Sequence, residues 1–415
     1  MAARDARNKL MGGGGFMFVR LLTGLLIAVL LVPVARACTA FVVFRNGTAL
    51  AGNNEDFWQT DTKMWIVPRT GSTRGSAGKY GRVYFGFNNF FPQGGMNESG
   101  LFFDGFATAR NPVKNSLDLP RFSGNIVDNV MANCGSVAEV VAVFEKHNLS
   151  FLENAMLMFG DRQGDSVIIE GDKMLRINGD HQVVTNFYQS LTPKEKCPCN
   201  RYKTAAAMLD AGNPGSVENC RDILAATCQT GSAPTQYSNV YDLKKGRVYL
   251  YHFQDFENVV CINLAEELDK GASEIDLPSL FPEKEKFKRF KEARAKQILQ
   301  KTEARRDRTF DPARLQDYVG TYSFDTGQAA KVKISMAQKG TGLFGSRAGE
   351  TESIEIFPEG NDTFFRFGEN GLEVYVFRRD ADNQVVAVTL SLKELGRTYE
   401  GEKDLEDGSS SEPSA

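Results

Sequence analysis

The position in this 415-residue chain best suited to chemistry is a cysteine that follows a run of small residues. Ala35-Arg36-Ala37 precedes Cys38 and supplies small residues at the −3 and −1 positions of a signal-peptidase site. Cleavage after Ala37 would leave Cys38 first in the mature chain, with a thiol and a free α-amine on one residue. Because an α-amine has a pKa of about 8 and a thiol one of about 8.5, this residue could supply both nucleophile and base.

Residues 1–37 have the features of an export signal. An apolar segment, residues 21–34, is short for a membrane span. It follows a basic region: Arg4, Arg7, Lys9 and Arg20. We therefore predict an exported protein, periplasmic or secreted, that meets the membrane only through its signal peptide. The alternatives are a retained anchor and lipidation of Cys38, although Ala35 and Arg36 depart from the usual lipoprotein pattern at −3 and −2.

The elements after Cys38 are predicted to place an acid beside it. Residues 38–44 have the β-branched and aromatic content of a buried strand, and Asn46-Gly47 is a hairpin turn signal. The returning strand, residues 48–57, brings Asp56 next to Cys38. A carboxylate there could orient and help protonate the new α-amine.

The rest of the chain divides by composition. Strands and two helical layers fill residues 38–280, including a capping box from Ser136 to Glu139 and a helix that starts at Arg201. This order indicates sheets flanked by helices. Residues 281–309 are predicted as a charged helical linker, residues 310–403 as a small all-β domain, and residues 404–415 as a disordered tail.

Composition narrows the classes of partner. A net charge of −3 argues against a nucleic-acid partner, and no cofactor is expected. The six cysteines other than Cys38 allow 15 pairings, and disulfides or free thiols are favoured over a metal site at Cys197-Pro-Cys199. The chain holds 30 phenylalanines, which fill a core or line an apolar pocket. The sequence is compatible with a homo-oligomer.

Four motifs in order carry a resemblance to a known family. They are CTAF at Cys38, GGMNESGL at residues 94–101, VTNF ending in Asn186 and Phe187, and the helix that begins Arg201-Tyr202. Over residues 38–268 the chain resembles the choloylglycine hydrolase and penicillin V acylase family of linear amide C–N hydrolases, which are N-terminal-nucleophile (Ntn) hydrolases. The resemblance implies an αββα sandwich followed here by the small all-β domain.

The resemblance also implies roles for individual residues. Cys38 would attack an amide carbonyl, and Asp56 would position its amine and thiol. Asn186 would stabilise the oxyanion, and Arg201 would favour the thiolate. This chain has Asn53 where bile-salt hydrolases carry an arginine, so the family's usual substrates are not expected.

The resulting hypothesis is an exported cysteine amidohydrolase that cleaves a linear amide of an N-acyl compound with an apolar acyl group. The resemblance implies the reaction, and the phenylalanines suggest the apolar group. One alternative is an acyltransferase that uses the same acyl-enzyme. Another is a non-catalytic envelope lipoprotein lipidated at Cys38.

Overall fold

The computed structural model describes residues 38–71, 75–88, 90–212, 214–324, 332–347, 353–368 and 371–404. The predicted signal peptide and residues 405–415 of the predicted tail lie outside these ranges. Asp404, the first residue of the predicted tail, donates its backbone N–H to the carbonyl oxygen of Thr321. Within the described ranges, no helix combines the length and the apolar character needed to cross a bilayer.

The predicted hairpin after Cys38 forms the centre of a six-stranded antiparallel sheet. Asn46 and Gly47 have φ angles of 50° and 75°, the left-handed values that a tight hairpin turn requires. Thr39 pairs with Asn54 across the hairpin. In spatial order the strands are β10 (His181–Thr185), β1 (Thr39–Val43), β2 (Leu50–Asp56), β11 (Thr235–Asp242), β12 (Arg247–His252) and β13 (Asp255–Asn263).

A second antiparallel sheet has eight strands. It contains the start of the GGMNESGL motif, where Gly94 of one strand pairs with Asp104 of the next. In spatial order the strands are β14 (Ser273–Asp276), β3 (Thr62–Val67), β4 (Arg82–Phe87), β5 (Pro92–Asn97), β6 (Phe102–Ala107), β7 (Ala155–Gly160), β8 (Ser166–Glu170) and β9 (Lys173–Arg176).

Alternating side chains of both sheets meet in one apolar cluster. Ala40 and Ala51 enter it from the six-stranded sheet, and Phe85, Phe102 and Met158 enter it from the eight-stranded sheet. Strand β2 is buried along its whole length, because the opposite face of its sheet is covered by helices.

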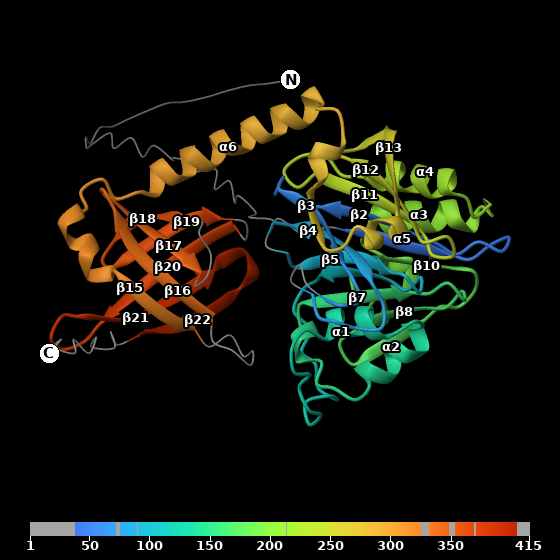
Figure 1. Cartoon of the computed structure of the whole chain (residues 1–415), viewed down its shortest axis with the longest axis horizontal. Helices are drawn as coiled ribbons and strands as arrows, with labels where there is room; N and C mark the ends of the chain where they lie inside the picture. Colours follow the sequence, from blue (N-terminus) through green and yellow to red (C-terminus); the bar gives the residue numbers. More distant parts are fainter. Residues whose placement is uncertain are drawn as a thin grey trace, which may run out of the picture. The chain divides into compact units, whose positions relative to one another are not determined.

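Helices lie outside both sheets (Figure 1). Helices α3 (Asn200–Asp210) and α4 (Val217–Thr227) pack on the six-stranded sheet, whereas α1 (Ile126–Asn133) and α2 (Val137–Phe144) pack on the eight-stranded sheet. At the start of α2 the Ser136 hydroxyl accepts the N–H of Glu139, as predicted, but the Glu139 carboxylate accepts the N–H of Gly135 rather than that of Ser136. The predicted capping box is therefore confirmed in its first half only.

The remaining helical segments are mostly short. One further helix, α5 (Leu264–Asp269), follows β13. The 3₁₀ segments are η1 (Ser150–Leu152), η2 (Gln189–Leu191), η3 (Lys194–Lys196), η4 (Leu277–Leu280), η5 (Pro312–Tyr318) and η6 (Lys393–Leu395). The charged segment predicted as a helix forms α6 (Glu285–Arg305).

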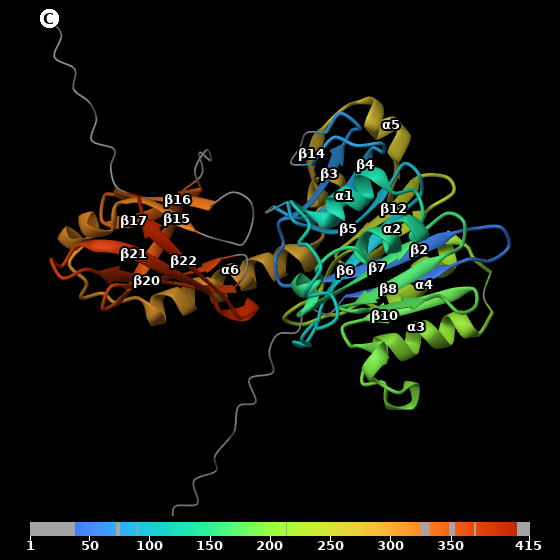
Figure 2. The same ribbon diagram turned by 90° about the horizontal axis from the view of Figure 1, so that it is seen from below.

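The C-terminal part is a closed barrel of eight antiparallel strands (Figure 1 and Figure 2). The first and last strands pair through Tyr322 and Lys403, which closes the barrel around a core that includes Tyr318 and Phe364. The strands are β15 (Gly320–Phe324), β16 (Val332–Lys339), β17 (Gly342–Arg347), β18 (Ile354–Gly360), β19 (Thr363–Gly368), β20 (Gly371–Arg379), β21 (Val385–Leu392) and β22 (Arg397–Lys403). The predicted mixture of helices and sheets is confirmed, and the C-terminal strands form a closed barrel.

Candidate active site

Arg201 brings the four predicted site residues together. It lies in the first turn of α3, and its Nη1 donates to the carbonyl oxygen of Cys38 at 2.6 Å. The same nitrogen lies 3.6 Å from Oδ2 of Asp56, and Nη2 lies 3.3 Å from Oδ1 of Asn186. One guanidinium therefore connects β1, the end of β2 and the residue after β10. The structure thus places Cys38, Asp56 and Asn186 within reach of one side chain.

Asp56 is held by residues that the sequence did not single out. Its Oδ1 accepts from the Thr235 hydroxyl, and its Oδ2 accepts from Nε2 of Gln229 at 2.8 Å. A β-bulge in β11 sets this contact, because Thr235 pairs with Asp56 while Tyr237 pairs with Glu55. Because of the bulge, the side chains of Thr235 and Tyr237 lie on opposite faces of the sheet. Each therefore lies on the same face as its partner on β2, Asp56 or Glu55.

Burial raises the pKa of Asp56 to about 7, although the Thr235 hydroxyl, Arg201 and Gln229 each lower it. A carboxyl with a raised pKa in the folded state binds its proton more tightly there than in the unfolded chain. Its contribution to stability is therefore complete below about pH 4 and is lost as the pH rises to about 7.

We expect Asp56→Asn to remove this pH dependence in the uncleaved chain. Between pH 4 and pH 7, the free energy of unfolding of wild type should fall relative to that of the variant by roughly 4 kcal/mol. Denaturant unfolding of both proteins across this range measures the difference. Asp118→Asn, which changes an exposed carboxyl, supplies the control. A constant difference between wild type and Asp56→Asn would refute the assignment.

The Cys38 thiol lies between the two sheets, in the apolar cluster that also contains Phe106. Burial raises its pKa well above the usual value, and the carboxyls of Glu55, Asp56 and Asp104 raise it further, while a hydrogen bond from the Asp56 backbone lowers it. In the uncleaved chain Cys38 is therefore a neutral thiol. A positive charge beside it would favour the thiolate.

Asn186 reaches from the end of β10 toward the eight-stranded sheet. Its Nδ2 donates to the carbonyl oxygen of Ala107 at 3.0 Å, and its Oδ1 faces Arg201. These two contacts set the orientation of the amide. The second N–H of Nδ2 has no partner within the described ranges, so it is a donor that an oxyanion could use.

Two buried acids near the thiol were missed. Glu55 continues the ladder in which Thr39 pairs with Asn54, so it is the neighbour of Cys38 on β2. Asp104 approaches from β6 of the facing sheet. The available signal was a carboxyl inside the apolar run of residues 102–106, because an acid is almost never fully buried without a reason.

All seven cysteines are described, and each is a free thiol. The structure therefore forms none of the 15 pairings that six cysteines allow. In the described part of the chain, no three His, Cys, Asp or Glu side chains are grouped as metal ligands.

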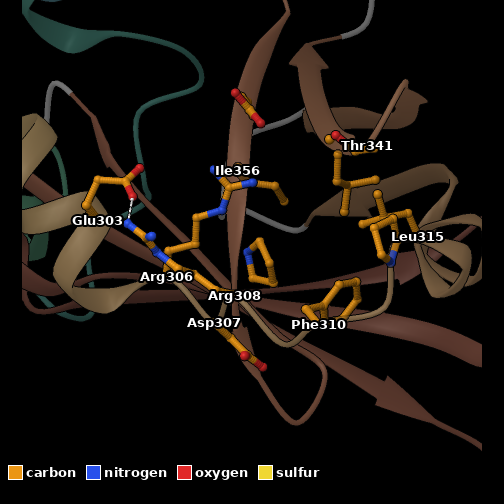
Figure 3. Close-up of a pocket in the computed structure, with 13 residues that line it drawn as sticks. Glu303, Arg306, Asp307, Arg308, Phe310, Leu315, Thr341 and Ile356 are labelled. Atoms are coloured by element: carbon orange, nitrogen blue, oxygen red, sulfur yellow. Dashed lines mark hydrogen bonds and ion pairs between the residues drawn. The ribbon is translucent and has the colours of Figure 1, made fainter.

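A cavity of about 470 Å³ lies in the C-terminal part of the chain (Figure 3). Arg308 donates to Glu303 at 2.6 Å on its rim, and Leu315 and Ile356 contribute apolar surface. Its lining contains no Cys, Ser or His and none of the four predicted site residues. The chemistry of the Cys38 site is therefore not located in this cavity.

Comparison with known proteins finds similar solved structures. No family model and no curated protein matches the chain. Penicillin V acylase from Agrobacterium tumefaciens is 21% identical, with 58% of this chain and 92% of that chain covered and a TM-score of 0.46. A mutant of the conjugated bile acid hydrolase from Clostridium perfringens is 19% identical, with 57% and 95% covered and a TM-score of 0.45. A variant of the same hydrolase is 18% identical, with 57% and 96% covered and a TM-score of 0.44.

Proposed function

We propose that this chain is an exported cysteine Ntn amidohydrolase of the choloylglycine hydrolase and penicillin V acylase type. The observation that carries the proposal is the contact of Arg201 with Cys38, Asp56 and Asn186. These residues come from four separate segments, and each has the chemical type that acyl transfer from an amide requires. Residues 1–37 would be removed as the signal peptide.

The proposed reaction begins with the free α-amine of cleaved Cys38 taking the thiol proton. The sulfur then forms a bond to the amide carbonyl carbon, and the N–H of Asn186 stabilises the oxyanion. The carbonyl re-forms as the C–N bond breaks, and the α-ammonium donates its proton to the departing amine. Water, deprotonated by the same α-amine, then releases the acid from the thioester and restores Cys38.

Asp56 and Arg201 act as positioning residues in this proposal. Arg201 holds the carbonyl of Cys38 and Oδ1 of Asn186, so the nucleophile and the oxyanion donor keep a constant separation. The contacts of Arg201 place Asp56 near Cys38, where its carboxylate would offer the new amine an opposite charge. An α-ammonium there would favour ionisation of Asp56, because opposite charges lower the pKa of a carboxyl.

We also propose that the two sheets and their flanking helices form the αββα sandwich of the Ntn hydrolases. The shared core between the sheets and the helices outside each of them support this assignment. The substrate is proposed to be a linear N-acyl amide with an apolar acyl group. The presence of Phe85, Phe102 and Phe106 in the same cluster as Cys38 supports an apolar environment for that group.

Trapping of the acyl-enzyme tests the proposal. The protein beginning at Cys38 should gain one acyl group from a p-nitrophenyl ester of a medium-chain acid, on Cys38 and on none of the other six cysteines. Intact mass followed by peptide mapping locates the group, which should then be lost to water. The exposed Cys261 is an internal control for simple thiol reactivity. Acylation of Cys261 in preference to Cys38 would count against the assignment.

Two further measurements address the alternatives. An acyltransferase would pass the acyl group to an added amine faster than to water, which product analysis detects. A lipoprotein would carry a diacylglycerol and an acylated α-amine on Cys38, and such an amine could not act as a base. The N-terminal mass of protein from membrane and non-membrane fractions separates this alternative from an enzyme.

A further inference from the structure

A group of polar side chains is buried between the sheets next to Cys38. We call it the inter-sheet polar cluster, and it consists of Asn53, Glu55, Asp104, Tyr237 and Asn239. Along the β2–β11 ladder Tyr237 pairs with Glu55, and Asn239 pairs with Asn53. Paired residues of an antiparallel ladder share a face and have Cβ atoms about 5 Å apart. The cluster members on β2 and β11 therefore lie on the same face of the sheet as the Cys38 thiol. Asp104, on β6 of the other sheet, faces these residues.

Four members of the cluster have polar atoms without a partner in the described part of the chain. They are Oδ2 of Asp104, both amide atoms of Asn53, Oδ1 of Asn239 and the hydroxyl of Tyr237. Each of these side chains belongs to a residue with 0% exposure. Buried polar groups nearly always have partners, because leaving them without one costs free energy. Their concentration beside the nucleophile indicates that a ligand supplies the missing contacts.

The types of the unpartnered atoms indicate the chemistry of that ligand. Three acceptors, one each on Asp104, Asn53 and Asn239, match the three N–H donors of a primary ammonium group. The orientation of Asn239 is set, because its Nδ2 donates to the hydroxyl of Tyr241 at 2.9 Å. Asn53 offers an acceptor in either orientation, since neither of its amide atoms has a partner.

The acids make the cluster selective for a cation. Asp104 has a single hydrogen bond, from the N–H of Gly105 to its Oδ1, and no cationic side chain contributes to its electrostatic environment within the described ranges. Glu55 adds a second carboxyl on the thiol side of the cluster. Burial and the carboxyls of Glu55 and Asp56 raise the pKa of Asp104 well above its usual value, so a bound ammonium would supply the opposite charge that holds Asp104 ionised.

We propose that the inter-sheet polar cluster binds a protonated primary amine carried by the leaving-amine portion of the substrate, close to the scissile amide. The inference rests on the proposed function, because it places this group beside the reacting thiol. The apolar cluster around Cys38 would then take the acyl group, and the polar cluster would take the amine side. The bound ammonium would also offset the three carboxyls near the thiol and so favour the thiolate.

Two substrates that differ in one heavy atom test the inference. N-octanoyl-1,2-diaminoethane carries a terminal ammonium where N-octanoyl-propylamine carries a methyl group, and both release octanoic acid. We expect the protein beginning at Cys38 to hydrolyse the first with a kcat/KM at least tenfold higher. Asp104→Asn should bring this ratio to about one, whereas the exposed control Asp118→Asn should keep it. The wild-type comparison stands even where Asp104→Asn fails to fold.

Calorimetric binding of the same two compounds to the Cys38→Ala protein separates this inference from the proposed function. Tighter binding of the ammonium compound by about tenfold, without hydrolysis by wild type, would retain the amine subsite and overturn the proposed function. Hydrolysis of both compounds at equal rates, with equal binding, would keep the function and overturn the subsite. Equal ratios for wild type and Asp104→Asn would likewise overturn the assignment of Asp104.

Discussion

Replacing Cys38 by alanine is expected to abolish amide hydrolysis, with a fall in kcat of about 10⁴-fold or more. In the proposed mechanism the sulfur forms the acyl-enzyme, and no neighbouring group could replace it. Any turnover that remains in the variant should come only from substrate binding and from the Asn186 N–H. Release of octanoic acid from an N-octanoyl amide measures the effect.

The fold of the Cys38→Ala variant should be retained. The thiol is buried in the apolar cluster and is a neutral group in the uncleaved chain, so the change removes one small apolar-like atom. We expect a loss of about 1 kcal/mol in the free energy of unfolding. Cys261→Ala is the matched control, because Cys261 is an exposed thiol on β13. Undiminished hydrolysis by Cys38→Ala, or an equal loss in Cys261→Ala, would eliminate Cys38 as the nucleophile.

Retention of a single residue before Cys38 is expected to silence the enzyme. In a chain that begins Ala37-Cys38 the nitrogen of Cys38 belongs to an amide and cannot accept a proton. General-base assistance is worth about 10² to 10⁴-fold, so kcat should fall by at least about 10²-fold. The burial and the three carboxyls that raise the pKa of the thiol make this loss larger, because the thiol cannot ionise without a base.

Two proteins released from the same fusion, one beginning at Cys38 and one at Ala37, provide the comparison. Their unfolding curves should agree, since they differ by one residue. The rate of thiol alkylation as a function of pH supplies a second readout, and it should rise at lower pH in the protein with a free α-amine. Equal activity of the two proteins would falsify the role of the α-amine, and the base would then have to come from a side chain.

Parts of the site could be predicted from the sequence because they depend on local features. The Asn46-Gly47 turn requires left-handed backbone angles that few other residue pairs adopt, so it determined the hairpin and the approach of Asp56 to Cys38. Asn186 and Arg201 were identified from motif order, since each stands at the boundary of a strand or a helix. The structure brings both to Cys38, through contacts of the Arg201 guanidinium.

Other contacts could not be predicted because they join segments far apart in the chain. Gln229 and Thr235 donate hydrogen bonds to Asp56 from 173 and 179 residues away in the sequence. The Thr235 contact depends on a β-bulge in β11 that the sequence pattern of the strand does not predict. The approach of Asp104 to the thiol depends on how two sheets face each other. Closure of the barrel depends on the pairing of its first and last strands.

From the sequence alone came the hairpin after Cys38, the predicted release of Cys38 as an N-terminal residue, and the choice of Asp56, Asn186 and Arg201 as candidate site residues. Turn chemistry, side-chain periodicity and a processing signal are local properties, so they can be read along the chain. The tertiary structure alone decided the environment of the thiol. Two sheets packed face to face bury Glu55, Asp104 and the unpartnered atoms of Asn53 beside Cys38, where desolvation and charge set the reactivity of the site.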